Sequence, residues 1–165
     1  MKILEVRSQT ETDDAANLMR GLYEAVRSIN SDDTQRVDAY YQGAWFFDDV
    51  PEIPTEYRPP RGDILIAYQR DKPVGTVAIC RMDQYHRELT SMFVTRECRG
   101  SGVAQVLCKR AIGLAKEHGY HTVRLMTSKR QVPAMRLYER LGFKLVKSWE
   151  TNPHDAHHYF ELGIA

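Results

Sequence analysis

The chain has 165 residues, the size of one domain with its own core, so we expect a single domain over residues 1–165. Charged residues make up 27% of it, and 23 basic against 22 acidic residues leave a net charge of +1. This balance excludes the basic surface that nucleic-acid binding needs, and no apolar run reaches the ~20 residues of a membrane span. We therefore expect neither a nucleic-acid nor a membrane partner.

Two further features of the composition limit the setting of the protein. The first residues lack the apolar core of a signal peptide, so we expect a cytoplasmic location. The three cysteines include no C-x-x-C pair, which argues against a disulfide framework and against a zinc site. The sequence thus predicts no metal.

The first part of the chain predicts one strand, two helices and an irregular loop. The strand covers Lys2–Arg7, and the helices are expected to be capped at Asp13–Asp14 and at Asp32–Asp33. Four prolines make the stretch 50–62 irregular. Because a long loop flanked by aromatic residues is more often functional than idle, we expect it to border a site.

The rest of the chain alternates between strands and helices. A turn at Arg70–Pro73 predicts a hairpin, and the two further helices run from Ser101 to about His118 and from Pro133 to Leu141. The expected strands cover 63–69, 74–82, 88–95, 120–127, 143–149 and 158–164. The order β-α-α-β-β-β-α-β-α-β-β predicts an α/β (α+β) fold, a mixed sheet with helices on both faces.

The most informative motif is a glycine turn between a strand and a helix, Arg99-Gly100-Ser101-Gly102-Val103-Ala104. A helix N-terminus presents unpaired N–H groups and a positive dipole end, and glycine lets the backbone approach an anion. The turn lacks the Gly-Lys-Ser/Thr of a P-loop and the third glycine of a dinucleotide fingerprint. It predicts a ligand that carries phosphate, with a purely structural turn as the alternative.

Two motifs together resemble the GNAT superfamily of N-acetyltransferases. Arg99-x-x-Gly102-x-Ala104 is similar to the Q/R-x-x-G-x-G/A loop that holds the pyrophosphate of acetyl-coenzyme A in that family. About thirty residues later the chain reads Ala134-Met135-Arg136-Leu137-Tyr138-Glu139-Arg140-Leu141-Gly142-Phe143, which resembles A-x-x-L-Y-x-x-L-G-F. The resemblance implies a mostly antiparallel seven-stranded sheet, splayed between its fourth and fifth strands, often by a bulge.

The same resemblance implies an activity. It predicts an acetyl-CoA-dependent N-acetyltransferase that transfers an acetyl group directly to a primary amine of a small molecule or peptide. The alternatives are a domain that binds acyl-CoA as a sensor, without catalysis, and a nucleotide-binding regulatory module. The sequence identifies neither the acceptor nor the oligomeric state, and a homodimer is compatible with it.

The resemblance also assigns roles to individual residues. Tyr138 would protonate or hydrogen-bond the leaving thiolate, with a core tyrosine as the alternative. Glu88 would act as the base through water, because it lies about 13 Å along the strand from Met92; a surface carboxylate is the alternative. The implied coenzyme-binding residues are Met92, Phe93, Val94, Arg99, Gly100, Ser101, Gly102, Val103, Ala104, Gln105 and Gln131. Gln131 departs from the family, which often has asparagine there.

The acceptor site is the least determined part of the prediction. We expect the first two helices, the proline loop and the last two strands to choose the acceptor, with Tyr40, Trp45, Tyr57, Arg58 and Arg61 as candidates. A further candidate is His154, in the loop before the last strand, which borders the acceptor pocket in the family. A guanidinium such as that of Arg58 would suit an acceptor with a carboxylate. Each of these residues could equally be packing or solvated surface.

Overall fold

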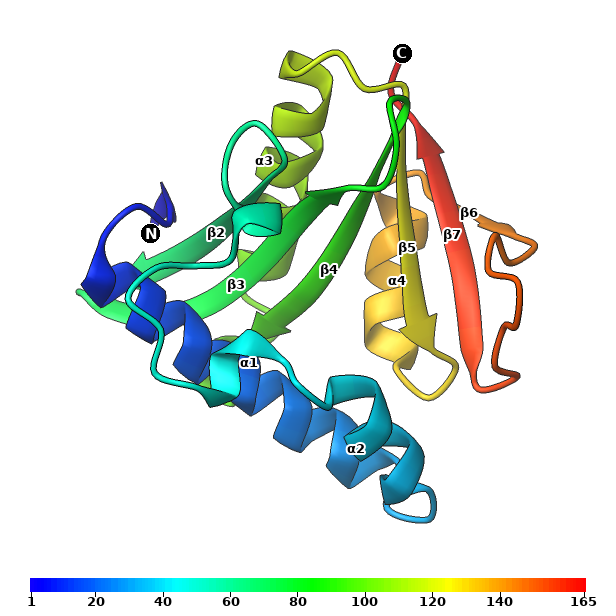
Figure 1. Cartoon of the computed structure of the whole chain (residues 1–165), viewed down its shortest axis with the longest axis horizontal. Helices are drawn as coiled ribbons and strands as arrows, with labels where there is room; N and C mark the ends of the chain where they lie inside the picture. The colour runs from blue at the N-terminus through cyan, green and yellow to red at the C-terminus, as the bar shows by residue number, and fades with distance from the viewer.

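A computed structural model describes all 165 residues, and its elements follow the expected order (Figure 1). The strands are β1 (Lys2–Glu5), β2 (Gly62–Gln69), β3 (Lys72–Arg81), β4 (His86–Val94), β5 (Thr122–Ser128), β6 (Lys144–Val146) and β7 (His157–Gly163). The helices are α1 (Gln9–Ile29), α2 (Thr34–Tyr41), α3 (Val103–Glu117) and α4 (Val132–Arg140). Short 3-10 turns are η1 (Trp45–Phe47), η2 (Thr55–Tyr57) and η3 (Arg96–Cys98). The strands form one seven-stranded sheet in the order β1-β2-β3-β4-β5-β7-β6, which confirms the predicted fold class.

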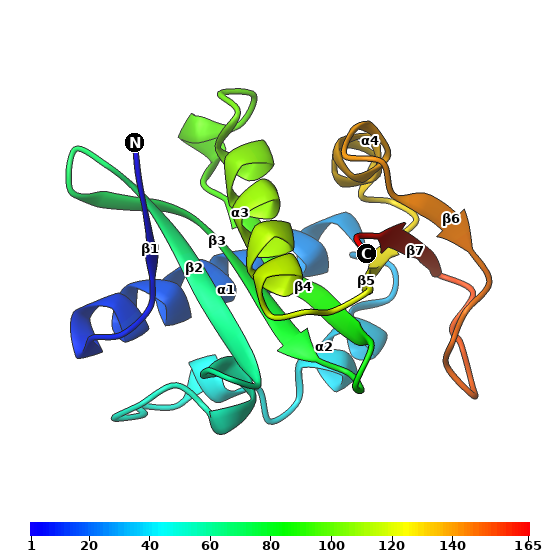
Figure 2. The same ribbon diagram turned by 90° about the horizontal axis from the view of Figure 1, so that it is seen from above.

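The helices cover both faces of the sheet (Figure 2). α3 and α4 lie on one face, and α1 and α2 lie on the other. Because side chains alternate along a strand, β2 sends Leu65 and Ala67 into the core under α3, and Ile64 and Ile66 into the core under α1. Two apolar cores therefore sandwich the sheet. None of the helices combines the length and the apolar character that a bilayer crossing requires.

The start of α1 differs from the sequence prediction. The backbone N–H of Glu11 donates to Ser8 Oγ at 3.2 Å, and the N–H of Ser8 donates to Glu11 Oε2 at 2.9 Å. This reciprocal capping box starts the helix at Gln9, so the predicted cap at Asp13–Asp14 is wrong. Asp33 does precede α2, but its side chain accepts from Arg36 Nε rather than from the helix backbone.

The hairpin between β2 and β3 and the proline loop beside it form as expected. Arg70 and Asp71 make the two-residue turn with φ of +50° and +60°. The proline loop is irregular apart from η2, and it packs closely on the sheet at Gly62. A Cβ on Gly62 would lie 2.1 Å from the carbonyl oxygen of Glu56, so this approach requires glycine.

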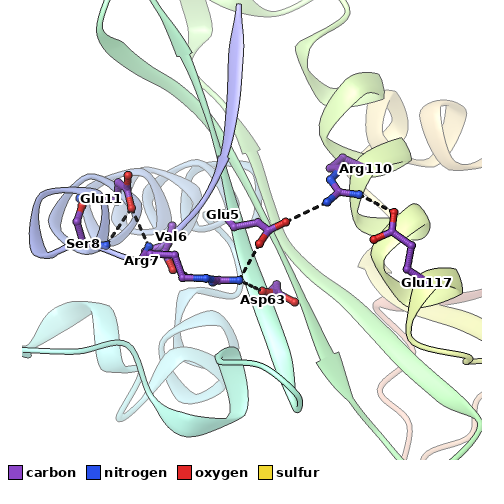
Figure 3. A network of polar contacts seen from close by, with 8 residues as sticks. All are labelled: Glu5, Val6, Arg7, Ser8, Glu11, Asp63, Arg110 and Glu117. Atoms are coloured by element: carbon purple, nitrogen blue, oxygen red, sulfur yellow. Dashed lines mark hydrogen bonds and ion pairs between the residues drawn. The ribbon is translucent and has the colours of Figure 1, made fainter.

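A charged network ties the N-terminal strand to its neighbours (Figure 3). Arg7 Nη2 donates to Glu5 Oε2 at 2.8 Å and to Asp63 Oδ1 at 2.6 Å. Arg110 of α3 reaches the other oxygen of Glu5 at 3.0 Å and Glu117 at 2.8 Å. The side chain of Asp63 is only 1% exposed, so the ion pair with Arg7 offsets the cost of burying its charge.

The sheet opens in its middle, between β4 and β5 (Figure 1). The two strands run parallel and pair only from His86↔Thr122 to Glu88↔Arg124, after which they diverge. On its other side β4 carries a bulge against β3, where the register shifts and Ser91 takes a φ of +55°. The predicted splay between the fourth and fifth strands is therefore present, and β4 carries a bulge beside it.

Candidate active site

The opening between β4 and β5 forms a cleft through the sheet, with an empty volume of about 700 Å³ that includes space open to solvent. Its walls come from β4 and β5, from α4 with the residue before it, from the first residue of β7, and from α1 and α2 on the opposite face. Since α4 and α2 lie on opposite faces, both faces of the sheet contribute to the cleft (Figure 2). Two ligands that enter from opposite faces of the sheet can therefore meet in this cleft.

Tyr138 lies in this cleft, as the sequence suggested. Its ring packs against Phe160, with centroids 6.4 Å apart, and its side chain is almost fully buried. The hydroxyl makes no hydrogen bond within the protein, although the residue lines the cleft. Burial raises the pKa of Tyr138, so the phenol stays protonated at neutral pH. The cleft therefore contains a hydrogen-bond donor without a protein acceptor.

The bulged part of β4 forms one wall of the cleft. Met92 lines it, and Cys108 of α3 lies behind Met92 with 3.8 Å between the two sulfur atoms. Phe93 points to the opposite face, against α1, where its ring would lie 2.9 Å from a Cβ on Gly21. Val94 is buried. Because pairing with β5 ends at Glu88, the β5-facing edge of residues 89–94 has no strand partner.

The glycine turn presents a set of unpaired backbone donors just beyond β4. Gly100 and Gly102 have φ of +76° and +86°, and nothing lies within 4 Å of a Cβ built on either one. The N–H groups without a hydrogen bond inside the protein are those of Gly100, Gly102, Val103, Ala104 and Gln105. Ser101 Oγ donates to the carbonyl of Cys98. These are the features of an anion site at a helix N-terminus.

Two predicted coenzyme-binding side chains are engaged with the protein itself. Arg99 Nε donates to the carbonyl oxygen of Val94 at 3.3 Å, and its guanidinium lies 6.0 Å from the Phe93 ring. Gln131 Oε1 accepts from Thr127 Oγ1 at 2.9 Å, which fixes the amide at the edge of the cleft. The amide nitrogen of Gln131 donates to no protein group.

Glu88 stands beside the closed end of the cleft but does not line it. It is the last β4 residue paired with β5, and Thr90, two residues further along the strand, does line the cleft. Burial, and then the charge of Glu150, raise the pKa of the Glu88 carboxyl. A carboxylate with a raised pKa accepts a proton more readily than an ordinary surface carboxylate does.

Of the predicted acceptor-binding residues, Tyr40 of α2 lines the cleft, whereas Tyr57, Arg58 and His154 lie outside it. Tyr57 packs beside Trp45, with ring centroids 6.3 Å apart. Arg58 forms an ion pair with Glu52 at 2.6 Å. His154 accepts at Nδ1 from the N–H of Ala156 at 3.0 Å, and its ring lies 5.8 Å from that of His157, a residue of the cleft wall.

Arg36 and His157 line the cleft but were not among the predicted site residues. Arg36 Nη1 lies 3.3 Å from His157 Nε2, and its side chain is 15% exposed. Burial, and then the Arg36 charge, lower the pKa of His157, so the imidazole is neutral at neutral pH. No motif could have found this pair, because the two residues are 121 positions apart in the chain.

Comparison with known sequences shows where this site has relatives. The family model described as the acetyltransferase (GNAT) family matches residues 22–143, a range that includes the glycine turn and Tyr138. Human N-acetyltransferase 8B is 34% identical over 102 residues, covering 58% of this chain and 45% of the relative. Zebrafish N-acetylaspartate synthetase is 36% identical over 104 residues, covering 62% and 37%. The chain thus spans less than half the length of these curated relatives.

Solved structures share the fold at low sequence identity. An N-acetyltransferase of Thermoplasma acidophilum, in complex with coenzyme A, has a TM-score of 0.77 and 14% identity, with 99% of this chain and 100% of that chain covered. A GNAT-family acetyltransferase of Staphylococcus aureus has a TM-score of 0.72 and 18% identity, with 98% of each chain covered. Since the family model covers most of the sequence and its matched range contains the cleft tyrosine and the glycine turn, this chain belongs to the acetyltransferase (GNAT) family.

Proposed function

We propose that the protein transfers an acetyl group from acetyl-CoA directly to a primary amine of a small molecule or peptide. The observation that carries the proposal is the cleft between β4 and β5, where an unpaired strand edge faces a tyrosine without an internal hydrogen-bond partner. The free N–H groups of the glycine turn follow at the end of that strand. These three features match the three parts of a coenzyme thioester: diphosphate, amide-bearing arm and sulfur.

Binding would divide between the turn and the strand. The free N–H groups of Gly100 and of Gly102 to Gln105 suit the diphosphate, because the α3 dipole adds positive potential there. The free edge of Met92 to Val94 suits the amides of the pantetheine arm, which can pair with it as a strand would. The arm would then end beside Tyr138. Acetyl-CoA supplies the activated acetyl group at this point.

The protein would assist the transfer at two atoms. A backbone N–H of β4 near the bulge can stabilise the negative charge that develops on the carbonyl oxygen during attack by the amine. Tyr138 can donate to the sulfur as its bond to the acetyl carbon breaks. Because an ordinary phenol has a higher pKa than a thiol, full proton transfer is uphill by about 2 kcal/mol, and burial widens that gap. We therefore assign Tyr138 mainly to hydrogen bonding of the developing thiolate.

The incoming amine must lose its proton before it attacks. We propose that Glu88 accepts this proton through water, since it lies outside the cleft wall and its carboxyl pKa is raised. Tyr57, Arg58 and His154 stay candidates for contacts with the outer part of an acceptor.

Two comparisons support this activity. The Thermoplasma acidophilum protein was solved with coenzyme A, and a Bacillus anthracis protein described as a streptothricin acetyltransferase was solved with acetyl coenzyme A. That second structure has a TM-score of 0.58 and 21% identity, with 65% of each chain covered. The curated relatives are named for N-acetylation.

The experiment that tests the proposal measures coenzyme thiol release from acetyl-CoA in the presence of a panel of primary amines. We expect release that depends on both the protein and an amine, with mass spectrometry showing one acetyl group added to that amine. Calorimetry would show binding of acetyl-CoA. Binding without release across the panel would instead identify an acyl-CoA sensor.

A further inference from the structure

Arg36 is the one residue with a permanent charge in the cleft wall, and no carboxylate lines the cleft. It comes from α2, on the face of the sheet opposite α4 and Tyr138. The coenzyme is expected along β4 and α4, so the α2 wall is left for the acceptor. A cation on that wall favours an acceptor that carries negative charge.

The hydrogen bonds of Arg36 show how much of its guanidinium is free. Nε donates to Asp33 Oδ2 at 2.6 Å, and Nη2 donates to Asn30 Oδ1 at 3.1 Å. Nη1 contacts His157 Nε2 at 3.3 Å. Of the five N–H groups, three are thus used, and one on each terminal nitrogen is left. The terminal nitrogens of a guanidinium can hold a carboxylate with two hydrogen bonds.

The contact with Arg36 also determines what His157 can offer. A guanidinium is only a donor, so Nε2 of His157 accepts and the ring proton sits on Nδ1. The imidazole therefore has no free lone pair with which to take a proton from the amine. Its remaining polar group, the Nδ1–H, points away from the guanidinium, so the role of His157 is to position Arg36 through Nε2.

The position of Asp33 leaves the positive charge of Arg36 effective inside the cleft. Asp33 is not part of the cleft wall, and its side chain is 45% exposed, whereas that of Arg36 is 15% exposed. Water therefore screens the carboxylate more than the guanidinium. Asp33 and Asn30 orient Arg36 without occupying the N–H groups that remain.

We propose that the acceptor is an amine that also carries a carboxylate, as an amino acid does, and that Arg36, positioned by its contact with His157, binds this carboxylate in the cleft. The inference rests on the proposed N-acetyltransferase function. The amine would then point across the cleft, toward the bulge of β4 and Tyr138. Arg36 replaces Arg58, which is paired with Glu52 outside the cleft, as the guanidinium that selects the acceptor.

The test compares each amino acid with its own primary amide as acceptor, using α-amino acids and longer ω-amino acids. For each enzyme, the ratio of kcat/KM for the acid to kcat/KM for the amide is measured. We expect the unmodified protein to prefer the acid, and Arg36→Gln to lower the ratio by about 10- to 100-fold. The ratio does not depend on the fraction of folded enzyme, so partial unfolding of the variant leaves it valid. Comparing ratios between enzymes also cancels the difference in amine pKa between acid and amide.

Two further variants sharpen the result. Arg36→Lys keeps the charge but loses the planar guanidinium, so its ratio should fall between those of the unmodified protein and Arg36→Gln. Arg27→Gln removes a guanidinium that pairs with Asp38 of α2 outside the cleft, and its ratio should equal that of the unmodified protein. An unmodified protein that prefers the amides, or an Arg36→Gln ratio that does not change, would overturn the inference. If only amines without a carboxylate are acetylated, the inference fails and the proposed function stands. If no amine is acetylated, both the inference and the proposed function fail.

Discussion

The ring of Tyr138 packs edge-on against the ring of Phe143, with centroids 5.9 Å apart and an angle of 65° between their planes. Phe143 lies three residues after the end of α4, so the last residue of the motif packs against the tyrosine in its middle. The hydroxyl makes no hydrogen bond within the protein. A side chain fixed through its apolar ring and free at its polar end can serve a ligand without losing an internal contact.

Tyr138→Phe should therefore reduce catalysis without unfolding the protein. We expect kcat to fall by about 10²–10⁴-fold, while calorimetry shows nearly unchanged affinity for coenzyme A. Tyr68→Phe is the matched control, since Tyr68 donates to Asp14 Oδ2 at 2.7 Å, away from the cleft. That variant should lose some stability and keep its kcat. Unmodified turnover in Tyr138→Phe would remove Tyr138 from the mechanism.

Gly102→Ala should weaken coenzyme binding at the glycine turn. With a φ of +86°, alanine at this position costs about 1–2 kcal/mol in strain, although a Cβ would meet no protein atom within 4 Å. The new methyl group would lie beside the N–H groups assigned to the diphosphate. Gly119→Ala is the control, because Gly119 follows the other end of α3 with a φ of +78° and equally open surroundings. Both should lower the melting temperature, but only Gly102→Ala should raise the Kd for coenzyme A.

Glu88→Gln should change how the rate depends on pH. The base acts as a carboxylate, so in the unmodified protein its contribution is lost as pH falls through the raised pKa of Glu88. It is also not needed above the pKa of the amine, which is then already deprotonated. The deficit of the variant should therefore be largest between these two pKa values and shrink on either side.

The control for that measurement is Glu24→Gln, which changes an exposed carboxylate on α1. Its profile of kcat/KM against pH should follow that of the unmodified protein. A Glu88→Gln deficit that stays constant over the whole range would identify Glu88 as a structural residue.

Gly62→Ala should destabilise the contact between the proline loop and the sheet. The added Cβ would lie 2.1 Å from the Glu56 carbonyl oxygen and 2.7 Å from that of Ile79, and both obstacles are backbone atoms. We expect a loss of about 1–3 kcal/mol in the free energy of unfolding, measured by urea denaturation. Gly163→Ala adds the same methyl group to β7, where nothing lies within 4 Å, and should cost much less.

Much of the fold could be predicted because local signals agreed with the order of elements. The start of α1 was wrong because the aspartates at 13 and 14 were preferred as caps, although Ser8-x-x-Glu11 is the capping-box pattern. β6 is shorter than the expected 143–149, ending at Val146. The placement of β7 between β5 and β6 depends on tertiary packing, which periodicity does not report.

The two walls of the candidate site were predictable to different degrees. Tyr138 and the glycine turn lie in contiguous motifs, and their positions follow from the elements that carry them. Arg36 and His157 meet only because α2 packs near the start of β7, and neither stands in a recognisable pattern. Acceptor selection is therefore the part of the site that the sequence left open.

The short pairing between β4 and β5 has a mechanical consequence. Three residue pairs at one end of β4 and β5 join the two halves of the sheet, so the halves can hinge about this end. A small rotation about the three pairs produces a larger displacement at the unpaired ends of β4 and β5. The buried residues Arg87 and Val123 are paired at this end and do not line the cleft, so they can set the width of the cleft without touching either substrate.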